Sequence, residues 1–224
     1  MMPLQNRVLP NGDIIATSAR GTLMGNRGLL HNDHKEVVRP FRLKAWITCA
    51  LEFKGRKRQL MSPGMYTELF FLDEVTALAA GHRPCAECRR PRFNEFKQAW
   101  QLAHSESADG KLKVAEIDAI LHEQRLSSDG SRSLWQASLA ELPIGTMIER
   151  DGRYYAVHAS GLLPWHADGY GQALAGATEG QVMVVTPRAT VAVLAAGYEP
   201  AFHESANSDQ GARNGPEARL KAGS

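Results

Sequence analysis

The chain has 224 residues, of which 43% are hydrophobic and 22% charged, so it can bury a core without disulfide staples. No uninterrupted apolar run approaches the roughly 20 residues that span a bilayer, and residues 1–10 lack the apolar segment of a secretion signal. These features argue against membrane and secreted proteins and predict a cytoplasmic protein. The formal net charge of +2 divides unevenly, because residues 1–100 carry 16 Lys and Arg against 9 Asp and Glu, and the remainder carries 10 against 15. A basic first half favours a polyanionic partner.

The first half predicts loops, short strands and two helices. Residues 1–45 are rich in glycine and basic residues, which indicates loops, and the alternation over 45–53 predicts a strand. A basic turn leads to a returning strand at 59–61, and another strand is expected at 67–72. Asp73 is placed to cap a helix over 74–80 that stops at Gly81. A second helix follows Pro91 and ends near residue 104.

The second half predicts a helix followed by small β structure. The helix spans 114–126, between polar segments at 105–112 and 127–133. Asp151-Gly152 predicts a hairpin of strands at 146–149 and 154–157. The remaining predicted elements are strands at 162–165 and 181–186, and a helix that ends at Gly197.

The fold class expected from these elements is α+β. Residues 1–104 would form a small, basic, zinc-knuckle-like module of strands and short helices, and residues 113–203 a helix plus a small β-rich unit. Residues 204–224 are small and polar and are expected to be a disordered tail. Residues 73–84 and 189–200 also match one another at a constant offset of 116, which indicates either a common helix-stop motif or a duplicated unit.

The three cysteines point to metal chemistry. An odd, low count argues against a secreted disulfide framework. Cys85 and Cys88 form a C-x-x-C pair, which in a reducing compartment indicates metal binding or redox chemistry. Redox pairs open a helix directly after a strand, whereas here a helical stretch and Gly81 precede the pair, which favours the metal.

The segment 69–89 resembles the second half of the metal-binding domain of the Ada DNA-repair protein, through an Ala-rich helix followed by the run GHRPCAEC. The resemblance implies a zinc site of four cysteines that orders a small domain against DNA. One cysteine of that family's first pair is also a methyl acceptor, but this chain lacks the upstream C-x-x-x-C pair, so the resemblance does not extend to that role. The chain as a whole also resembles a group of bacterial proteins, and this second resemblance implies no activity.

A closed structural zinc site needs four ligands, of which Cys85 and Cys88 supply two. Cys49 is the candidate third ligand, although its place on the apolar face of a strand is equally typical of a buried core cysteine. His31 is the candidate fourth ligand, with His34 beside it. Three protein ligands alone would leave a coordination position open, as in zinc enzymes. The alternative in which no metal binds stays open.

Basic residues near the cysteines are candidate phosphate contacts, which position a nucleic acid without reading its sequence, although a solvated surface is equally common. They are Arg20, Arg27, Arg56, Lys57, Arg58, Arg89, Arg90 and Arg92. The leading hypothesis is therefore a zinc-binding protein that contacts nucleic acid through its basic half. A first alternative is a zinc-dependent hydrolase or deaminase-like enzyme, since His34, Glu36 and 84–88 match H-x-E…P-C-x-x-C without the helical context. A second alternative is a structural interaction module without catalysis.

Overall fold

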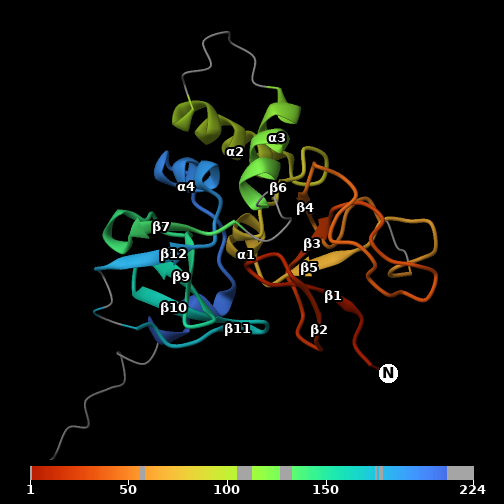
Figure 1. Cartoon of the computed structure of the whole chain (residues 1–224), viewed down its shortest axis with the longest axis horizontal. Coiled ribbons are helices and arrows are strands. Elements are labelled where there is room, and N and C mark those ends of the chain that lie inside the picture. The colour runs from red at the N-terminus through yellow and green to blue at the C-terminus, as the bar shows by residue number, and fades with distance from the viewer. Residues whose placement is uncertain are drawn as a thin grey trace, which may run out of the picture.

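A computed structural model of the chain contains two six-stranded sheets and four α-helices in the part that it describes (Figure 1). The described residues are 2–55, 59–104, 113–126, 133–174, 176 and 179–210. The mixture of separate sheets and helices confirms the α+β class.

The first sheet is built from the first 84 residues in the order β2-β1-β5-β3-β4-β6. Its strands are β1 (Gln5–Val8), β2 (Ile14–Ala16), β3 (Leu23–Asn26), β4 (Ile47–Cys49), β5 (Leu69–Phe71) and β6 (Arg83–Pro84). Three of these strands lie where loops are predicted, because strands of three or four residues give no sustained alternation. The strand predicted at 59–61 is wrong, since Met61 has a positive φ of 51°, which a strand does not accommodate.

The second sheet is antiparallel throughout, in the order β11-β10-β9-β8-β12-β7. Its strands are β7 (Trp135–Ser138), β8 (Met147–Arg150), β9 (Arg153–His158), β10 (Gly161–His166), β11 (Gly169–Tyr170) and β12 (Gln181–Val184). The predicted hairpin joins β8 to β9 and is confirmed. Asp151 and Gly152 both have positive φ, at 53° and 70°, as a tight hairpin turn requires.

The helices lie close to their predicted positions. They are α1 (Glu74–Ala79), α2 (Arg90–Ala103), α3 (Val114–Arg125) and α4 (Arg188–Ala195). Among the helices in the described part of the chain, none combines the length and apolar character that crossing a membrane requires. A 3-10 helix, η2 (Glu204–Gln210), follows them, so the tail expected from residue 204 begins with ordered residues.

The hydrophobic core crosses the boundary between the two predicted regions. One cluster of buried side chains joins α1, α2, α3 and α4, and Figure 1 shows the last three helices gathered on one side of the sheets. Its members include Leu78, Phe96, Trp100, Ile117, Leu121, Val193 and Tyr198. The regions 1–104 and 113–203 therefore share a core instead of packing separately.

Helix α1 lies between the two sheets, and all six of its residues are buried (Figure 1). Asp73 caps its N-terminus as predicted, because Asp73 Oδ1 accepts hydrogen bonds from the backbone N–H of Thr76 at 2.8 Å and from its hydroxyl at 2.7 Å. Asp73 Oδ2 accepts from the Tyr170 hydroxyl at 2.8 Å and from the His203 N–H at 3.0 Å. The cap thus joins the first half of the chain to the second.

The carboxylate of Glu74, the first residue of α1, is also buried and shared between the two halves. It accepts ion-paired hydrogen bonds from Arg89 and Arg92, each at 2.8 Å. From the second half it accepts the Tyr198 hydroxyl at 2.7 Å and the Ala201 N–H at 3.0 Å. Burial alone would raise the pKa of Glu74, but the charge of Arg89 and the bonds from the other three partners outweigh it and hold that pKa below its usual value.

Replacement of Glu74 by Gln is expected to destabilise the fold by about 3 kcal/mol, because it removes the buried carboxylate with which two partly buried guanidinium groups are paired. Since the folded pKa of Glu74 lies below its unfolded value, the wild-type stabilisation is present above pH 4.5 and is lost as the pH falls through the folded pKa. The free energy of unfolding of the variant should therefore not show the decrease at low pH that Glu74 causes in the wild type. The measurement is the free energy of unfolding in denaturant at several pH values.

Glu95→Gln is the matched control, because Glu95 pairs with the same Arg92 from an exposed position. Exposed ion pairs contribute little, so this variant should lose less than about 1 kcal/mol. Equal losses of unfolding free energy in the two variants would show that the burial of Glu74 does not increase its contribution to stability.

Candidate metal centre

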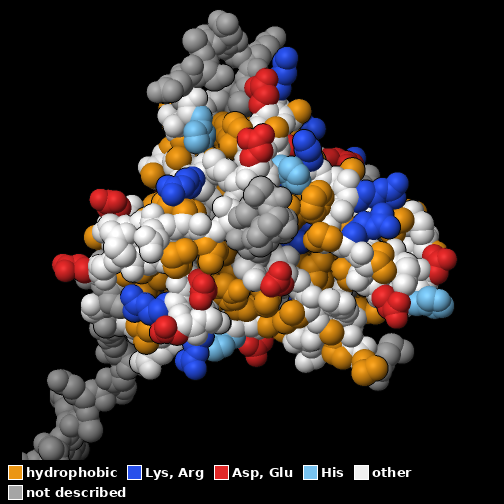
Figure 2. Space-filling view, in the orientation of Figure 1, with side chains coloured by type: hydrophobic (Ala, Val, Ile, Leu, Met, Phe, Trp, Pro, Cys, Tyr) orange, Lys and Arg blue, Asp and Glu red, His pale blue; other side chains and the backbone are white. Residues whose placement is uncertain are grey.

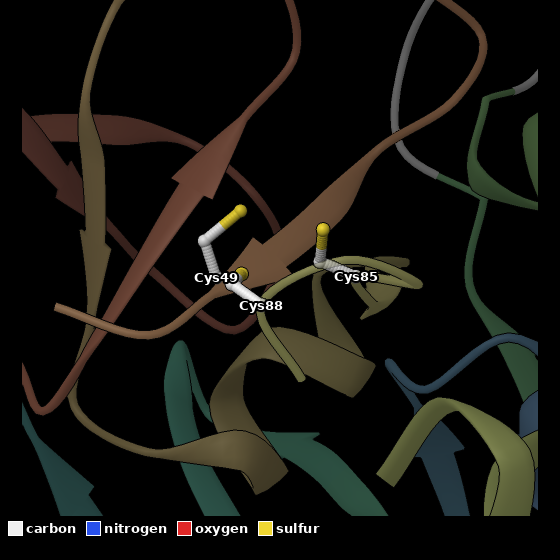
Figure 3. Close-up of side chains that lie close together, drawn as sticks. All are labelled: Cys49, Cys85 and Cys88. Atoms are coloured by element: carbon white, nitrogen blue, oxygen red, sulfur yellow. The ribbon is translucent and has the colours of Figure 1, made fainter. Parts of the chain in front are cut away.

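Three cysteines from distant parts of the chain converge at one edge of the first sheet. Cys49 ends β4, Cys85 follows β6, and Cys88 lies in the turn before α2 (Figure 3). Their sulfur atoms all lie within 4.8 Å of one another. Tetrahedral zinc with Zn–S bonds of about 2.3 Å places sulfurs about 3.8 Å apart, so a small contraction gives metal-binding geometry. The cluster can hold a metal ion.

Parallel pairing between β4 and β6 brings the first two thiols together. Ile47 lies beside Arg83 and Thr48 beside Pro84 in the register of the two strands. The backbone N–H of Cys85 then donates to Thr48 O at 2.9 Å, which extends the pairing by one residue. Because side chains alternate between the two faces of a sheet, this register places Cys49 and Cys85 on the same face.

Arg89 ties the two parts of the cluster to each other. This residue follows Cys88, and its guanidinium donates to the hydroxyl of Thr48, the neighbour of Cys49, at 2.7 Å. The same guanidinium donates to Glu74 at 2.8 Å. The Arg89 side chain therefore links the buried carboxylate at the start of α1 to the side chain of Thr48, next to Cys49.

The three thiols differ in acidity. The hydrogen bond donated by Cys49 is the largest cause that lowers the pKa of Cys85, to about 5, and the backbone N–H groups of Cys88 and Glu87 also lower it. The Glu87 N–H lies 3.4 Å from the Cys85 sulfur. Donating to Cys85 raises the pKa of Cys49, and burial raises it further. Burial also raises the pKa of Cys88. In the metal-free cluster, Cys85 is therefore the most acidic of the three thiols.

All three cysteines line a cavity of about 980 Å³. Most of its other walls are apolar or aromatic, and three carboxylates also line it, those of Glu52, Glu68 and Glu87. Glu68 is only 3% exposed, and its Oε2 accepts the backbone N–H of Met61 at 2.8 Å. The cavity therefore places a buried carboxylate in the same space as the thiols.

His31 does not join the cysteine cluster, which corrects its assignment as the fourth ligand. Its ring is buried and its two nitrogens are held elsewhere, Nδ1 by the Thr67 hydroxyl at 2.6 Å and Nε2 by Ser62 O at 3.2 Å. These bonds fix the ring within the loops, so His31 serves the packing of the first half.

The deaminase-like motif also fails to assemble. His34 and Glu36 are exposed in a turn organised by Asn32, whose side-chain oxygen accepts both of their backbone N–H groups at 3.0 Å. Neither side chain belongs to the metal cluster or lines its cavity. The match to H-x-E is therefore a coincidence of spacing.

Arg27 is buried, which corrects its assignment as a nucleic-acid contact. Its side chain is 1% exposed and lies over the ring of Trp46, with the guanidinium carbon 3.9 Å from the ring centroid. It also donates to His82 Nε2 at 3.2 Å and to Gly12 O at 2.9 Å. A cation enclosed in this way is part of the core and does not reach a phosphate.

The guanidinium groups of Arg89 and Arg92 are both paired with Glu74. Arg20 and Arg90 are exposed, and residues 56–58 lie outside the described part of the chain. Figure 2 shows Lys and Arg side chains gathered over loops of the first half, and charges of both signs interspersed over the rest of that face. Contact with nucleic acid stays a prediction.

Sequence reasoning assigned no role to Glu68. The signal that could have identified it is a charged residue directly before a buried apolar strand. Charged side chains are rarely buried in that position unless they have a partner or a role in a site. The cavity itself has no such signal, since its walls come from four separate segments of the chain.

Comparison of the chain with models of known protein families, with curated proteins and with solved structures finds no match in any of the three. The resemblance to the Ada metal-binding domain therefore stays a prediction. The case for function depends on the cysteine cluster and its cavity.

In metal-free protein, Cys85 should be the first cysteine to react with iodoacetamide at pH 6.5. Its lowered pKa keeps it a thiolate until the pH falls to about 5, whereas the raised pKa values of Cys49 and Cys88 keep them protonated. We expect modification of Cys85 to be at least about tenfold faster, measured by mass spectrometry of tryptic peptides. Cys88 is the internal control, because it is more exposed than Cys85. Faster modification of Cys88 would contradict the assignment.

Proposed function

We propose that the chain is a zinc-dependent hydrolase in which Cys49, Cys85 and Cys88 bind one zinc ion and the fourth coordination position opens into the adjoining cavity. The observation that carries this proposal is that all three cysteines line the same cavity. In the part of the chain that the structure describes, the cluster contains no fourth His, Cys, Asp or Glu. Structural zinc sites take four protein ligands, whereas catalytic sites take three and keep one position for water or substrate.

The donor set supports zinc over other common metals. Thiolates select zinc, Cu(I) and iron–sulfur clusters, whereas magnesium and calcium take oxygen ligands. Backbone N–H groups at Cys85 stabilise negative charge on its sulfur, as metal-bound thiolates require. When bound, zinc would supply a Lewis acid that polarises a carbonyl group or lowers the pKa of water.

Glu68 is the residue to which we assign proton transfer. Its carboxylate lines the cavity with the cysteines, and the bond from the Met61 N–H holds Oε2 in place. A positioned carboxylate can accept a proton from water and return it to a leaving group. Glu52 and Glu87 are exposed and are not assigned this role.

The other two hypotheses fit the site less well. A purely structural module predicts a closed set of four ligands, which the described residues do not provide. Nucleic-acid binding is not part of the proposal, because three of the assigned arginines are buried or paired with Glu74.

Purified protein is expected to contain one zinc ion per chain, measured by mass spectrometry of the metal. Cys49→Ser, Cys85→Ser and Cys88→Ser should each weaken zinc binding by at least about tenfold, since each removes one of only three ligands. His31→Ala is the control and should retain zinc, because His31 lies outside the cluster. Absence of zinc in the wild type, or full retention in Cys49→Ser, would refute the proposed site.

The hydrolytic role is tested with Glu68→Gln and a panel of chromogenic ester and amide probes. The variant should keep its zinc, because Glu68 is not a ligand, and should lose about 100-fold in the chelator-sensitive rate. Glu52→Gln, at an exposed position on the same cavity, is the matched control and should keep most of the rate. A wild type that hydrolyses none of the probes in a zinc-dependent manner would count against the enzyme hypothesis.

A further inference from the structure

We infer that the cavity beside the cysteine cluster takes a small, electrically neutral molecule with an apolar or aromatic body and a nitrogen or sulfur atom that reaches the metal. This inference rests on the proposed function and names the ligand class of the same site. It is drawn from the size of the cavity, the arrangement of its walls and the charge of the cluster.

The size of the cavity matches a small molecule. Ligand sites for drug-sized molecules and cofactors occupy roughly 300–1,000 Å³, and this cavity of about 980 Å³ lies at the upper end of that range. A single water molecule, whose share of liquid volume is about 30 Å³, fills only a small part of it. The space therefore accommodates a ligand body in addition to a metal-bound atom.

The apolar wall is continuous with the metal ligands on one face of the first sheet. Met24 lies beside Phe70 in the pairing of β3 with β5, and beside Cys49 in the pairing of β3 with β4. Cys85 continues this row beyond Cys49, as the pairing of β4 with β6 shows. A molecule held at the metal would thus lie along a surface of aromatic and thioether side chains.

Exposed apolar side chains extend this wall outward. Leu51 and Leu60 line the cavity and are 50% and 37% exposed. Ile47 and Phe53 line it as well. Contiguous apolar surface around a concave site is typical of a ligand-binding site, since covering it removes apolar area from water. The apolar part of the wall therefore favours a ligand with an apolar body, while Asn26, Lys54 and the three carboxylates line the rest of the cavity.

The charge of the cluster selects the group that meets the metal. Three thiolates and one Zn²⁺ ion together carry a net charge of −1, and three carboxylates against one lysine line the same cavity, so a neutral donor is favoured over an anionic one. A neutral nitrogen or sulfur donor adds no further negative charge and suits a thiolate-bound metal. Carboxylates and phosphates are therefore disfavoured as the metal-binding group of the ligand.

The experiment uses full-length protein loaded with Co²⁺ in place of zinc, because the visible spectrum of cobalt reports its fourth ligand. The probes are imidazole, 4-phenylimidazole and phenylacetate. We expect 4-phenylimidazole to shift the cobalt bands and to bind at least about tenfold more tightly than imidazole, since its phenyl ring adds apolar area to be buried. Phenylacetate, with a similar body and an anionic head, should leave the bands unchanged. Equal affinity for the two imidazoles, or tight binding of phenylacetate, would overturn the inference.

Two matched variants locate the binding surface. Leu51→Asp places a charge on the cavity wall and should weaken 4-phenylimidazole at least about fivefold with little effect on imidazole. Ile144→Asp changes a side chain of nearly equal exposure, 49%, that does not line the cavity, and should leave both affinities unchanged. Equal effects of the two variants would refute the assigned surface. Absence of thiolate-bound cobalt would overturn the proposed function together with this inference, whereas bound cobalt without probe preference would overturn the inference alone.

Discussion

Two adjacent carboxylates buried at the start of α1 organise the molecule. A buried charge is stable only where partners satisfy it, and residues from both halves of the chain supply those partners. Tyr170 bonds to Asp73, and Tyr198 bonds to Glu74, so the second half is held against the first. Arg89 forms an ion pair with Glu74 and also donates a hydrogen bond to Thr48 in the strand that ends with Cys49. The same requirement thus joins the halves and positions the cysteine cluster.

Local signals were enough to predict α1 with its cap and the hairpin between β8 and β9, and to single out the cysteine pair as a candidate for metal binding. These features depend on residues that are neighbours in the chain, such as Asp151 and Gly152. Cys49 was predicted as the third member and lies in the cluster, whereas His31 was predicted as the fourth and does not, because loop packing holds its ring elsewhere. The assignment of Arg27 as a nucleic-acid contact was wrong, because the number of basic residues does not show that this guanidinium is enclosed beside Trp46. Whether such a residue is exposed or buried depends on its tertiary contacts, which the composition does not show.

The two matching segments end their helices in the same way. After α1, the N–H groups of residues 81 and 82 donate to the carbonyls of residues 78 and 77. After α4, residues 197 and 198 donate to residues 194 and 193, which are the same bonds at an offset of 116. Gly81 and Gly197 both have positive φ, at 78° and 97°. The match in sequence therefore corresponds to a match in structure, and only the first of the two segments continues into cysteines.

The pairing of β4 with β6 has a consequence for how the chain tolerates insertions and deletions. Inserting one residue within β4 would turn the Cys49 side chain to the opposite face of the sheet, although every ligand would still be encoded. Lengthening the connection between Cys49 and β5 costs little, because the entropy of closing a loop grows slowly with its length. A change in chain length within that connection therefore leaves the register of Cys49 with Cys85 unchanged, whereas the same change within β4 separates the two thiols.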